Sequence, residues 1–323
     1  MTRAIQIHET GGPEVLKMSE VVVGDPGPGE VRIDQTAIGV NFIDVYHRTG
    51  LYPQPMPFIP GMEGAGVIGT IGPGVTGLKV GDRVGYADLI GSYSETRLVR
   101  ADRLVVLPDS IPDELAAAIL LKGMTAQVLL RQVYKLAKGD IVLIHAAAGG
   151  LGTIMCQWAT SLGATVIGTV SSDEKAEKAK ANGCQYPIVY TRESFADRVN
   201  EITEGQKVPV VYDSVGKVTF SGSLDCLSPR GLLVICGSSS GPAPAIDPSL
   251  LAAKGCLFLT RSVVFTYIST RAELDAAAAD LFTAVAAGKI KIPPNQRYPL
   301  AEAERAHQDL QNRRTTGATV LSV

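Results

Sequence analysis

The chain has 323 residues, and its 30 Lys and Arg residues against 32 Asp and Glu residues give a formal net charge of −2. This length is enough for two domains, and the near-neutral charge argues against nucleic acid or another polyanion as the main partner. No apolar run approaches the roughly 18 residues of a membrane helix, and the N-terminal residues lack the apolar core of a signal peptide. The five cysteines form no C-x-x-C pair, which excludes a disulfide scaffold and indicates a reducing, cytoplasmic compartment.

Residues 1–108 are predicted to form a compact, Gly-rich β-barrel. Short β-prone runs alternate there with turn signals such as Pro26-Gly27-Pro28-Gly29 and Gly72-Pro73-Gly74. The predicted strands are Arg3–His8, Glu30–Val40, Gly64–Ile71, Asp82–Tyr86 and Leu104–Leu107. The first 155 residues contain no cysteine and no H-x-x-x-H pair, so no metal site is predicted in this half.

A helix is predicted to follow the barrel. Pro112, Asp113 and Glu114 are typical of a first helical turn. The Ala- and Leu-rich run behind them extends to about Leu136, with Gly123 as a candidate break. Two more helical stretches are predicted near the C-terminus, at Arg271–Ala287 and Leu300–Arg313.

From Gly139 onward, predicted strands and helices alternate. The strands are Ile141–His145, Thr165–Val170, Ile188–Tyr190, Val208–Asp213, Leu232–Cys236 and Cys256–Thr260. The helices between them are Leu151–Leu162, Asp173–Asn182, Glu193–Thr203 and Thr219–Leu227. Such alternation is typical of an α/β fold, a doubly wound parallel sheet with helices on both faces.

The first strand–helix turn of this region carries the strongest local motif. Its Ala147-x-Gly149-x-x-Gly152 aligns with the G-x-G-x-x-G pattern of dinucleotide-binding proteins. Gly149 and Gly150 would let backbone N–H groups approach a pyrophosphate at the helix N-terminus. The helix behind the turn has one apolar face, formed by Leu151, Ile154, Met155, Trp158, Ala159 and Leu162. We therefore expect a dinucleotide-binding site, and a plain strand–turn–helix is the alternative.

The end of the second strand of this region favours NADP(H) over NAD(H). An NAD site has an acidic residue there to bind the ribose 2′-hydroxyl, whereas this strand ends at Val170-Ser171-Ser172. Lys175 follows in the first turn of the next helix, and small hydroxyls with a cation suit a 2′-phosphate. Asp173 and Glu174 weaken this signal, because either could turn toward the ribose, and Lys175 could be an ordinary solvated lysine.

Seven short motifs distributed over essentially the whole chain match one known family. They are Gly39–Asp44, Gly50–Pro53, Pro60–Gly66, Lys122–Ala126, His145–Gly150, Val211–Gly216 and Gly237–Gly241. Through them the chain resembles the zinc-free quinone oxidoreductases of the medium-chain dehydrogenase/reductase superfamily, the group that includes zeta-crystallin.

The resemblance implies two domains and no metal. Residues 1–124 and 265–323 would form a GroES-like β-barrel catalytic domain, and residues 125–264 an inserted NADP-binding Rossmann domain. Zinc-dependent relatives have Cys at the position of Asn41 and His at that of Met62. They also carry a four-Cys lobe, whereas residues 91–100 contain no cysteine.

The resemblance also assigns cofactor-binding residues by motif. Those bordering the nicotinamide would be Asn41, Phe42, Ile43, Thr125 and Val128, together with Val215, Gly237, Ser238, Ser239, Ser240, Ser262, Val263 and Val264. Those at the phosphates would be Gly150 and Leu151 for the pyrophosphate, and Ser171, Ser172, Lys175, Tyr190 and Arg313 for the adenosine 2′-phosphate. Arg314 is an alternative to Arg313, and the apolar residues have an equal claim as core packing.

The implied reaction is the reduction of a quinone by NADPH, in which the cofactor supplies the redox chemistry and the protein orients the reactants. A quinone oxygen that gains charge needs a hydrogen-bond donor, for which Asn41, Tyr46 and Tyr52 are the candidates. Each of these side chains could instead make a structural hydrogen bond. Asp44 is expected to hold a neighbouring group in place rather than to abstract a proton.

Two other functions fit the same resemblance. A sister class of enzymes reduces enone or enal double bonds with the same fold and cofactor. A non-enzymatic alternative is a crystallin-like structural role or RNA binding, against which the net charge and the lack of aromatic–basic clusters argue.

A homodimer is also predicted. In a 3-2-1-4-5-6 strand order, the apolar Cys256–Thr260 strand would be an exposed sheet edge, and pairing with its two-fold copy would cover it.

Overall fold

The computed structural model describes residues 1–323, and the chain divides into two compact units. Unit 1 contains residues 1–124, 268–286 and 292–323, and unit 2 contains residues 125–267 and 287–291. Residues 287–291 of unit 2 are held to helix α3 (Gly150–Ser161) by two hydrogen bonds. Lys291 N donates to Gln157 Oε1 (2.7 Å) and Gln157 Nε2 donates to Lys291 O (3.2 Å).

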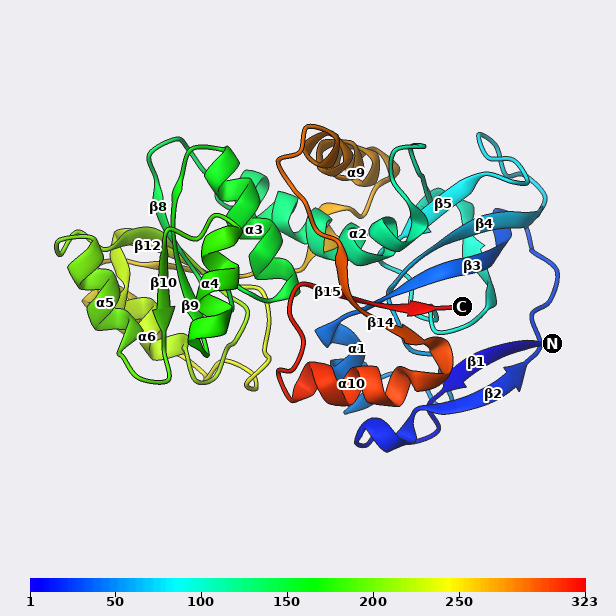
Figure 1. Cartoon of the computed structure of the whole chain (residues 1–323), viewed down its shortest axis with the longest axis horizontal. Helices are drawn as coiled ribbons and strands as arrows, with labels where there is room; N and C mark the ends of the chain where they lie inside the picture. The colour runs from blue at the N-terminus through cyan, green and yellow to red at the C-terminus, as the bar shows by residue number, and fades with distance from the viewer. The chain divides into compact units, whose positions relative to one another are not determined.

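Unit 1 is built on a seven-stranded sheet with the order β14-β15-β3-β4-β5-β7, and β6 pairs with β3. The strands are β3 (Glu30–Val40), β4 (Glu63–Ile71), β5 (Arg83–Tyr86), β6 (Thr96–Arg100), β7 (Val105–Val106), β14 (Pro294–Pro299) and β15 (Ala318–Ser322). The C-terminal β15 runs antiparallel beside β3, as Figure 1 shows. Both ends of the chain therefore contribute to this GroES-like barrel, which confirms the predicted fold class.

Unit 1 contains further short elements. Strand β1 (Thr2–Gln6), predicted at Arg3–His8, pairs with β2 (Lys17–Val21), which the sequence patterns did not indicate, and the two form a separate two-stranded sheet. Helix α1 (Phe42–Arg48) lies within the region that looks strand-like in sequence. This helix is only seven residues long, too short to show a helical period among strands. Short 3₁₀ turns occur at Pro13–Val15, Ala101–Arg103 and Leu300–Glu302.

Helix α2 (Asp113–Val128) runs unbroken through Gly123, so the candidate break at that residue is wrong. A Cβ on Gly123 would lie 2.5 Å from Leu281 Cδ1 on helix α9 (Arg271–Ala286). Gly123 therefore serves close helix–helix packing rather than a turn. After Val128 the helix loosens into a π-helical turn, Leu129–Val133. Helix α10 (Ala303–Gln311) ends before Arg313, which has a positive φ of 58°.

Unit 2 is a six-stranded sheet with the order β10-β9-β8-β11-β12-β13, in which every neighbouring pair is parallel. In sequence order this is the predicted 3-2-1-4-5-6 arrangement, and it confirms the doubly wound fold. The strands are β8 (Ile141–Ile144), β9 (Thr165–Val170), β10 (Tyr186–Val189), β11 (Val208–Asp213), β12 (Leu227–Ile235) and β13 (Phe258–Arg261). Buried Val, Leu and Ile side chains form its core, as expected for strands covered on both faces.

The helices of unit 2 connect these strands in the predicted alternation. They are α3 (Gly150–Ser161), α4 (Asp173–Ala181), α5 (Phe195–Ile202), α6 (Phe220–Asp225), α7 (Pro248–Ala253) and α8 (Val264–Tyr267). The sequence patterns did not indicate α7 and α8, each six residues or fewer. None of the helices combines the length and the apolar character that crossing a membrane requires.

Candidate active site

The Gly-rich turn between β8 and α3 is shaped for close backbone approach. Gly149 is the N-cap of α3, so the first N–H groups of this helix follow it directly. A Cβ on Gly152 would lie 2.3 Å from Ala146 O and 2.8 Å from Ala147 Cα. Only glycine therefore fits at the last position of the motif, where the helix meets the strand. The turn fits the pyrophosphate of a dinucleotide, whose charge the helix N-terminus favours.

The predicted cofactor residues of unit 2 lie mainly at one edge of its sheet. Because all six strands are parallel, the segments that follow them emerge on the same side. Gly150 and Leu151 follow β8, Ser171, Ser172 and Lys175 follow β9, Tyr190 follows β10, Val215 follows β11, Gly237 to Ser240 follow β12, and Ser262 to Val264 follow β13. Thr125 and the buried Val128 lie instead near the end of α2.

The ends of β9 and β10 bring the proposed 2′-phosphate residues together. Tyr190 N donates to Val170 O (3.1 Å), and Thr191 Oγ1 donates to Ser171 O (3.3 Å). Ser172 is the N-cap of α4, and its hydroxyl oxygen accepts a hydrogen bond from Lys175 N (3.3 Å). The backbone after β9, the backbone after β10 and the start of α4 are thus linked by hydrogen bonds.

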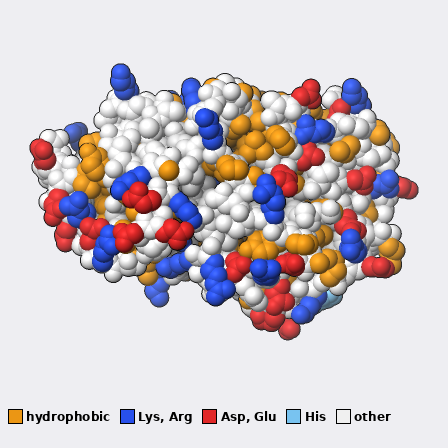
Figure 2. Space-filling model, in the orientation of Figure 1, with side chains coloured by type: hydrophobic (Ala, Val, Ile, Leu, Met, Phe, Trp, Pro, Cys, Tyr) orange, Lys and Arg blue, Asp and Glu red, His pale blue; other side chains and the backbone are white.

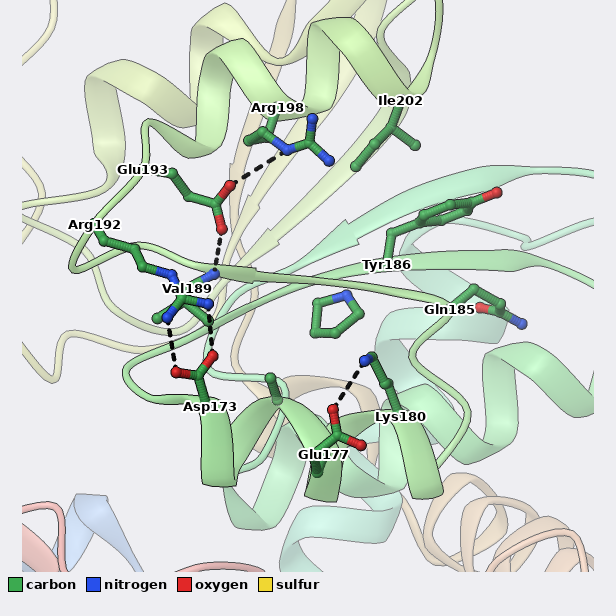
Figure 3. A pocket seen from close by; sticks show the side chains of 12 residues that line it. Asp173, Glu177, Lys180, Gln185, Tyr186, Val189, Arg192, Glu193, Arg198 and Ile202 are labelled. Atoms are coloured by element: carbon green, nitrogen blue, oxygen red, sulfur yellow. Dashed lines mark hydrogen bonds and ion pairs between the residues drawn. The ribbon is translucent and has the colours of Figure 1, made fainter.

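The two acids that weakened the NADP(H) prediction are paired with cations. Asp173 accepts hydrogen bonds from both Nη atoms of Arg192 (2.7 and 2.5 Å), as Figure 3 shows. Glu174 pairs with Lys178 one turn along α4 (2.8 Å). A side-chain hydrogen bond from Arg192 also lowers the pKa of Asp173. Each of the two carboxylates thus has a cationic partner on the protein surface.

Asp173 and Arg192 belong to a pocket of about 210 Å³ beside the edge strand β10. The other cations of this pocket are also paired, Lys180 with Glu177 (2.9 Å) and Arg198 with Glu193 (3.3 Å), as Figure 3 shows. Figure 2 shows the same mixture of acidic and basic side chains over α4 and α5. The pocket therefore presents no concentration of positive charge.

Asp213, which sequence reasoning did not single out, organises the loops after β11 and β12. Its buried carboxylate accepts hydrogen bonds from Val215 N (2.9 Å) and Gly216 N (2.9 Å). Ser240 Oγ donates to Val215 O (2.8 Å), which joins the second loop to the first. An acid at the end of a buried strand was the available signal. Asp213 holds the proposed nicotinamide-side residues in place.

In unit 1, the candidate donor Asn41 lies in a buried polar cluster. Asn41 is the N-cap of α1, and its backbone N–H donates to Asp44 Oδ2 (2.8 Å). Its side chain bonds to Glu63 of β4 and to Lys122 of α2. In the sequence Glu63 and Lys122 stand out only as parts of motifs, because residues 22 and 81 positions away carry no local signal of contact with Asn41. Phe42 and Ile43 occupy the first turn of α1.

The other two candidate donors, Tyr46 and Tyr52, contact each other. Their ring centroids lie 5.2 Å apart with an interplanar angle of 67°. The Tyr52 ring also lies 6.2 Å from the His47 ring. Tyr52 N donates to Tyr46 O (3.0 Å), which fixes the segment after α1 against this helix. The structure therefore groups both tyrosines with the Asn41 helix.

Asp44 holds neighbouring groups in place, as predicted, through a buried chain of side chains. Tyr93 Oη donates to Asp44 Oδ2 (3.1 Å) and lies 2.9 Å from His307 Nε2 on α10. Burial raises the pKa of Asp44 to about 7 and lowers the pKa of His307 to about 3. The chain links α1, the segment before β6 and α10.

The rival residues Arg313 and Arg314 differ in their surroundings. Arg314 Nη1 forms an ion pair with Asp309 Oδ1 (3.4 Å), and Arg314 N donates to Asp309 O (2.9 Å). Arg313 follows the end of α10 and is exposed. Both arginines therefore stay candidates for the proposed phosphate contact. The structure shows no group of three or more His, Cys, Asp or Glu side chains arranged to hold a metal ion.

Comparisons with known proteins place this architecture. Residues 27–109 match the alcohol dehydrogenase GroES-like domain, and residues 150–283 match the family described as zinc-binding dehydrogenase. A quinone oxidoreductase of Pseudomonas aeruginosa is 51% identical over 323 residues, with 99% of each chain covered. The chain belongs to the quinone oxidoreductase family of the medium-chain dehydrogenase/reductase superfamily. The resemblance carried by the seven motifs is thereby confirmed.

Two further relatives refine the picture of this quinone oxidoreductase family. A structure of Escherichia coli quinone oxidoreductase complexed with NADPH has a TM-score of 0.98 and 46% identity, with both chains fully covered. A 2-haloacrylate reductase of Burkholderia sp. is 48% identical over 330 residues, with 99% of each chain covered. This chain is thus similar over its full length both to a quinone oxidoreductase and to a 2-haloacrylate reductase.

Proposed function

We propose that this protein reduces quinones with NADPH and without a metal ion. The observation that carries the NADPH assignment is the strand end at Ser171 and Ser172, where Lys175 is present and Asp173 and Glu174 are held by other cations. The full-length similarity to quinone oxidoreductases supports the acceptor class. Residues 125–264 would be the cofactor-binding domain, and residues 1–124 with 265–323 the catalytic domain.

The protein's own residues would bind and orient the reactants. The α3 N-terminus at Gly150 and Leu151 would hold the pyrophosphate, while Ser171, Ser172, Lys175, Tyr190 and Arg313 would bind the 2′-phosphate. The loops that Asp213 and Ser240 fix, with Ser262 to Val264, would border the nicotinamide. Bound NADPH supplies the hydride. Asn41, Tyr46 and Tyr52 are the proposed donors to the acceptor oxygen.

A steady-state assay tests the acceptor class. NADPH oxidation should accelerate strongly when 1,4-benzoquinone is added to the purified protein, because one hydride and one proton from solvent convert a quinone to its hydroquinone. The control is the same assay without acceptor. If no quinone accelerates NADPH oxidation while a 2-alkenal does, the quinone assignment is wrong.

A second acceptor class is supported by the 2-haloacrylate reductase among the relatives. An enone, enal or haloacrylate also places negative charge on an oxygen conjugated to the carbon that accepts hydride, so the same donors would serve. The ratio of kcat/KM for benzoquinone and for 2-haloacrylate, measured with one enzyme preparation, distinguishes the two classes.

Metal independence is the first prediction. Asn41 and Met62 occupy positions where zinc-dependent relatives have Cys and His, and Asn41 is already bonded to Lys122 and Glu63. Dialysis against a strong chelator should leave the NADPH-dependent rate unchanged, and purified protein should contain no stoichiometric zinc. Loss of rate on chelation, with recovery on adding Zn²⁺, would contradict this prediction.

A homodimer paired through β13 is the second prediction. This strand pairs only with β12 and ends the sheet, and Phe258 is 60% exposed on it. Such an edge invites pairing with a second copy. Light scattering should give about twice the 34.0-kDa chain mass, and Phe258→Glu should shift the protein toward monomer. A wild-type monomer at micromolar concentration would refute the dimer.

The compartment is proposed to be the cytoplasm. Cys156, Cys184 and Cys226 are buried free thiols, Cys236 is partly buried and Cys256 is exposed, and none is bridged. Free thiols of this kind persist in a reducing environment.

A further inference from the structure

The carboxamide of Asn41 is held from both sides by buried charged groups. Asn41 Nδ2 donates to Glu63 Oε2 (2.8 Å), and Lys122 Nζ donates to Asn41 Oδ1 (2.7 Å). Lys122 Nζ also donates to Glu63 Oε2 (3.0 Å), which closes a three-membered cluster. The Glu63 side chain is completely buried and that of Lys122 is 10% exposed.

This pair of neighbours allows only one orientation of the amide. An ammonium group only donates hydrogen bonds, and a carboxylate only accepts them. Rotating the Asn41 carboxamide by 180° would point its NH₂ at the Lys122 ammonium and its oxygen at the Glu63 carboxylate. Both contacts would then be repulsive, so Lys122 and Glu63 together decide where the amide nitrogen lies.

The backbone supports the cluster at several points. Leu121 N donates to Glu63 Oε1 (2.8 Å), so one carboxylate oxygen is fixed by α2 and the other by the cluster. A Cβ on Gly39 would lie 2.3 Å from Glu63 Oε2 and 2.2 Å from Ala117 O. Glycine at this position of β3 therefore leaves the space that the carboxylate occupies. Asn41 itself is fixed through its backbone bond to Asp44.

Stability alone does not explain two buried charges at this place. A buried ion pair costs desolvation that its attraction repays incompletely, and apolar side chains of similar volume are often as stable or more stable. The charges do, however, polarise the amide. A donor on Oδ1 makes the Nδ2–H groups better donors, and Glu63 uses only one of the two hydrogens.

We propose that Lys122 and Glu63 are positioning residues, which aim the second Nδ2–H of Asn41 at the acceptor oxygen that gains negative charge during hydride transfer. This inference rests on the proposed function and deepens it, because it assigns a donor and the residues that orient it. Lys122 and Glu63 act through Asn41 and are not themselves required to contact the acceptor.

A double-mutant cycle tests the inference with benzoquinone and NADPH. Asn41→Ala should lower kcat by about 100-fold, the range found when a donor to a developing oxyanion is removed. Lys122→Met should lower kcat by about 10-fold or more, because the amide loses its fixed orientation. In the Asn41→Ala background, Lys122→Met should cost nothing further. The Kd for NADPH should be the same in Lys122→Met as in the wild type, because Lys122 is not among the proposed cofactor-binding residues.

Two companion variants separate positioning from stability. Glu63→Gln/Lys122→Met removes both charges, so no carboxylate is buried without its partner, and it should show the same loss of kcat in a folded protein. Arg103→Met breaks another buried ion pair of unit 1, with Asp88, in which Arg103 Nε lies 2.6 Å from Asp88 Oδ2. This matched control should lower the Tm and leave kcat unchanged.

The outcomes are distinguishable. If Lys122→Met retains the wild-type kcat, or if its loss multiplies with that of Asn41→Ala, the positioning role is overturned. Equal losses of kcat in Arg103→Met and Lys122→Met would show that the loss comes from lower stability, and this result would also overturn the positioning role. If none of the quinones tested supports NADPH oxidation by the wild-type protein, the proposed function is overturned, and the inference with it.

Discussion

Lys175→Ala is expected to weaken NADPH binding by about 10- to 100-fold and to leave NADH binding nearly unchanged. A hydrogen bond to a charged group contributes roughly 1.5–3 kcal/mol, and 1.4 kcal/mol corresponds to about tenfold in Kd. Lys175 lies in the first turn of α4, and its backbone N–H donates to Ser172 Oγ after the end of β9, where the 2′-phosphate would lie. NADH lacks this phosphate and therefore loses no contact.

Lys178→Ala is the matched control for this experiment. It removes the same charge from the same helix, but Lys178 pairs with Glu174 on the surface and lies one turn further from the strand end. Fluorescence titration of both nucleotides with wild type and both variants gives the comparison. If Lys175→Ala weakens the binding of NADH as much as that of NADPH, or changes the Kd of neither nucleotide, Lys175 does not bind the 2′-phosphate. Asp173 or Glu174 would then be the better candidate for the ribose partner, and the enzyme would be NADH-dependent.

Opposite pH dependences of stability are expected when Asp44 and His307 are replaced one at a time. The folded chain holds a proton on Asp44 up to a pKa of about 7 and keeps His307 neutral down to a pKa of about 3. The unfolded chain does the reverse between about pH 4 and 6.5, since its Asp is ionised and its His is charged. The two differences nearly cancel in the wild type, so this pair contributes little net slope there.

Each variant leaves one of these shifts uncompensated. In Asp44→Asn only His307 remains, and stability should rise with pH between about 3 and 6.5, because the unfolded state binds the extra proton. In His307→Gln only Asp44 remains, and stability should fall with pH between about 4 and 7, because the folded state binds it. Each change should amount to about 4 kcal/mol across its window, at 1.36 kcal/mol per pKa unit.

Urea unfolding of the wild type and both variants across this pH range is the measurement. Tyr93, Lys122, Glu63 and Arg48 are the other ionisable groups that act on the pair, and all are unchanged in these variants. Parallel pH profiles for Asp44→Asn and the wild type would show that Asp44 is ionised in the folded protein, contrary to expectation.

Local sequence patterns by themselves determined the doubly wound sheet and the Gly-rich turn. The spacing of apolar residues in strands and helices, and the glycines that no other residue can replace, are local signals. A short stretch of sequence is enough to recognise them. Gly152 is an example, since its neighbours Ala146 and Ala147 leave no room for a Cβ. The absence of an acid at the end of β9 is equally local, and it indicated the NADP(H) site before any contact was known.

Only the tertiary structure decided the partners of the polar groups. Asp173 and Glu174 looked available in sequence, and the fold pairs them with Arg192 and Lys178. Gly123 looked like a helix break, and packing against Leu281 makes it part of a continuous helix. Asn41, Glu63 and Lys122 belong to three elements, and their bonds arise when β4 and α2 pack against the start of α1. Such contacts depend on which elements become neighbours, a property of the whole fold that a short stretch of sequence does not contain.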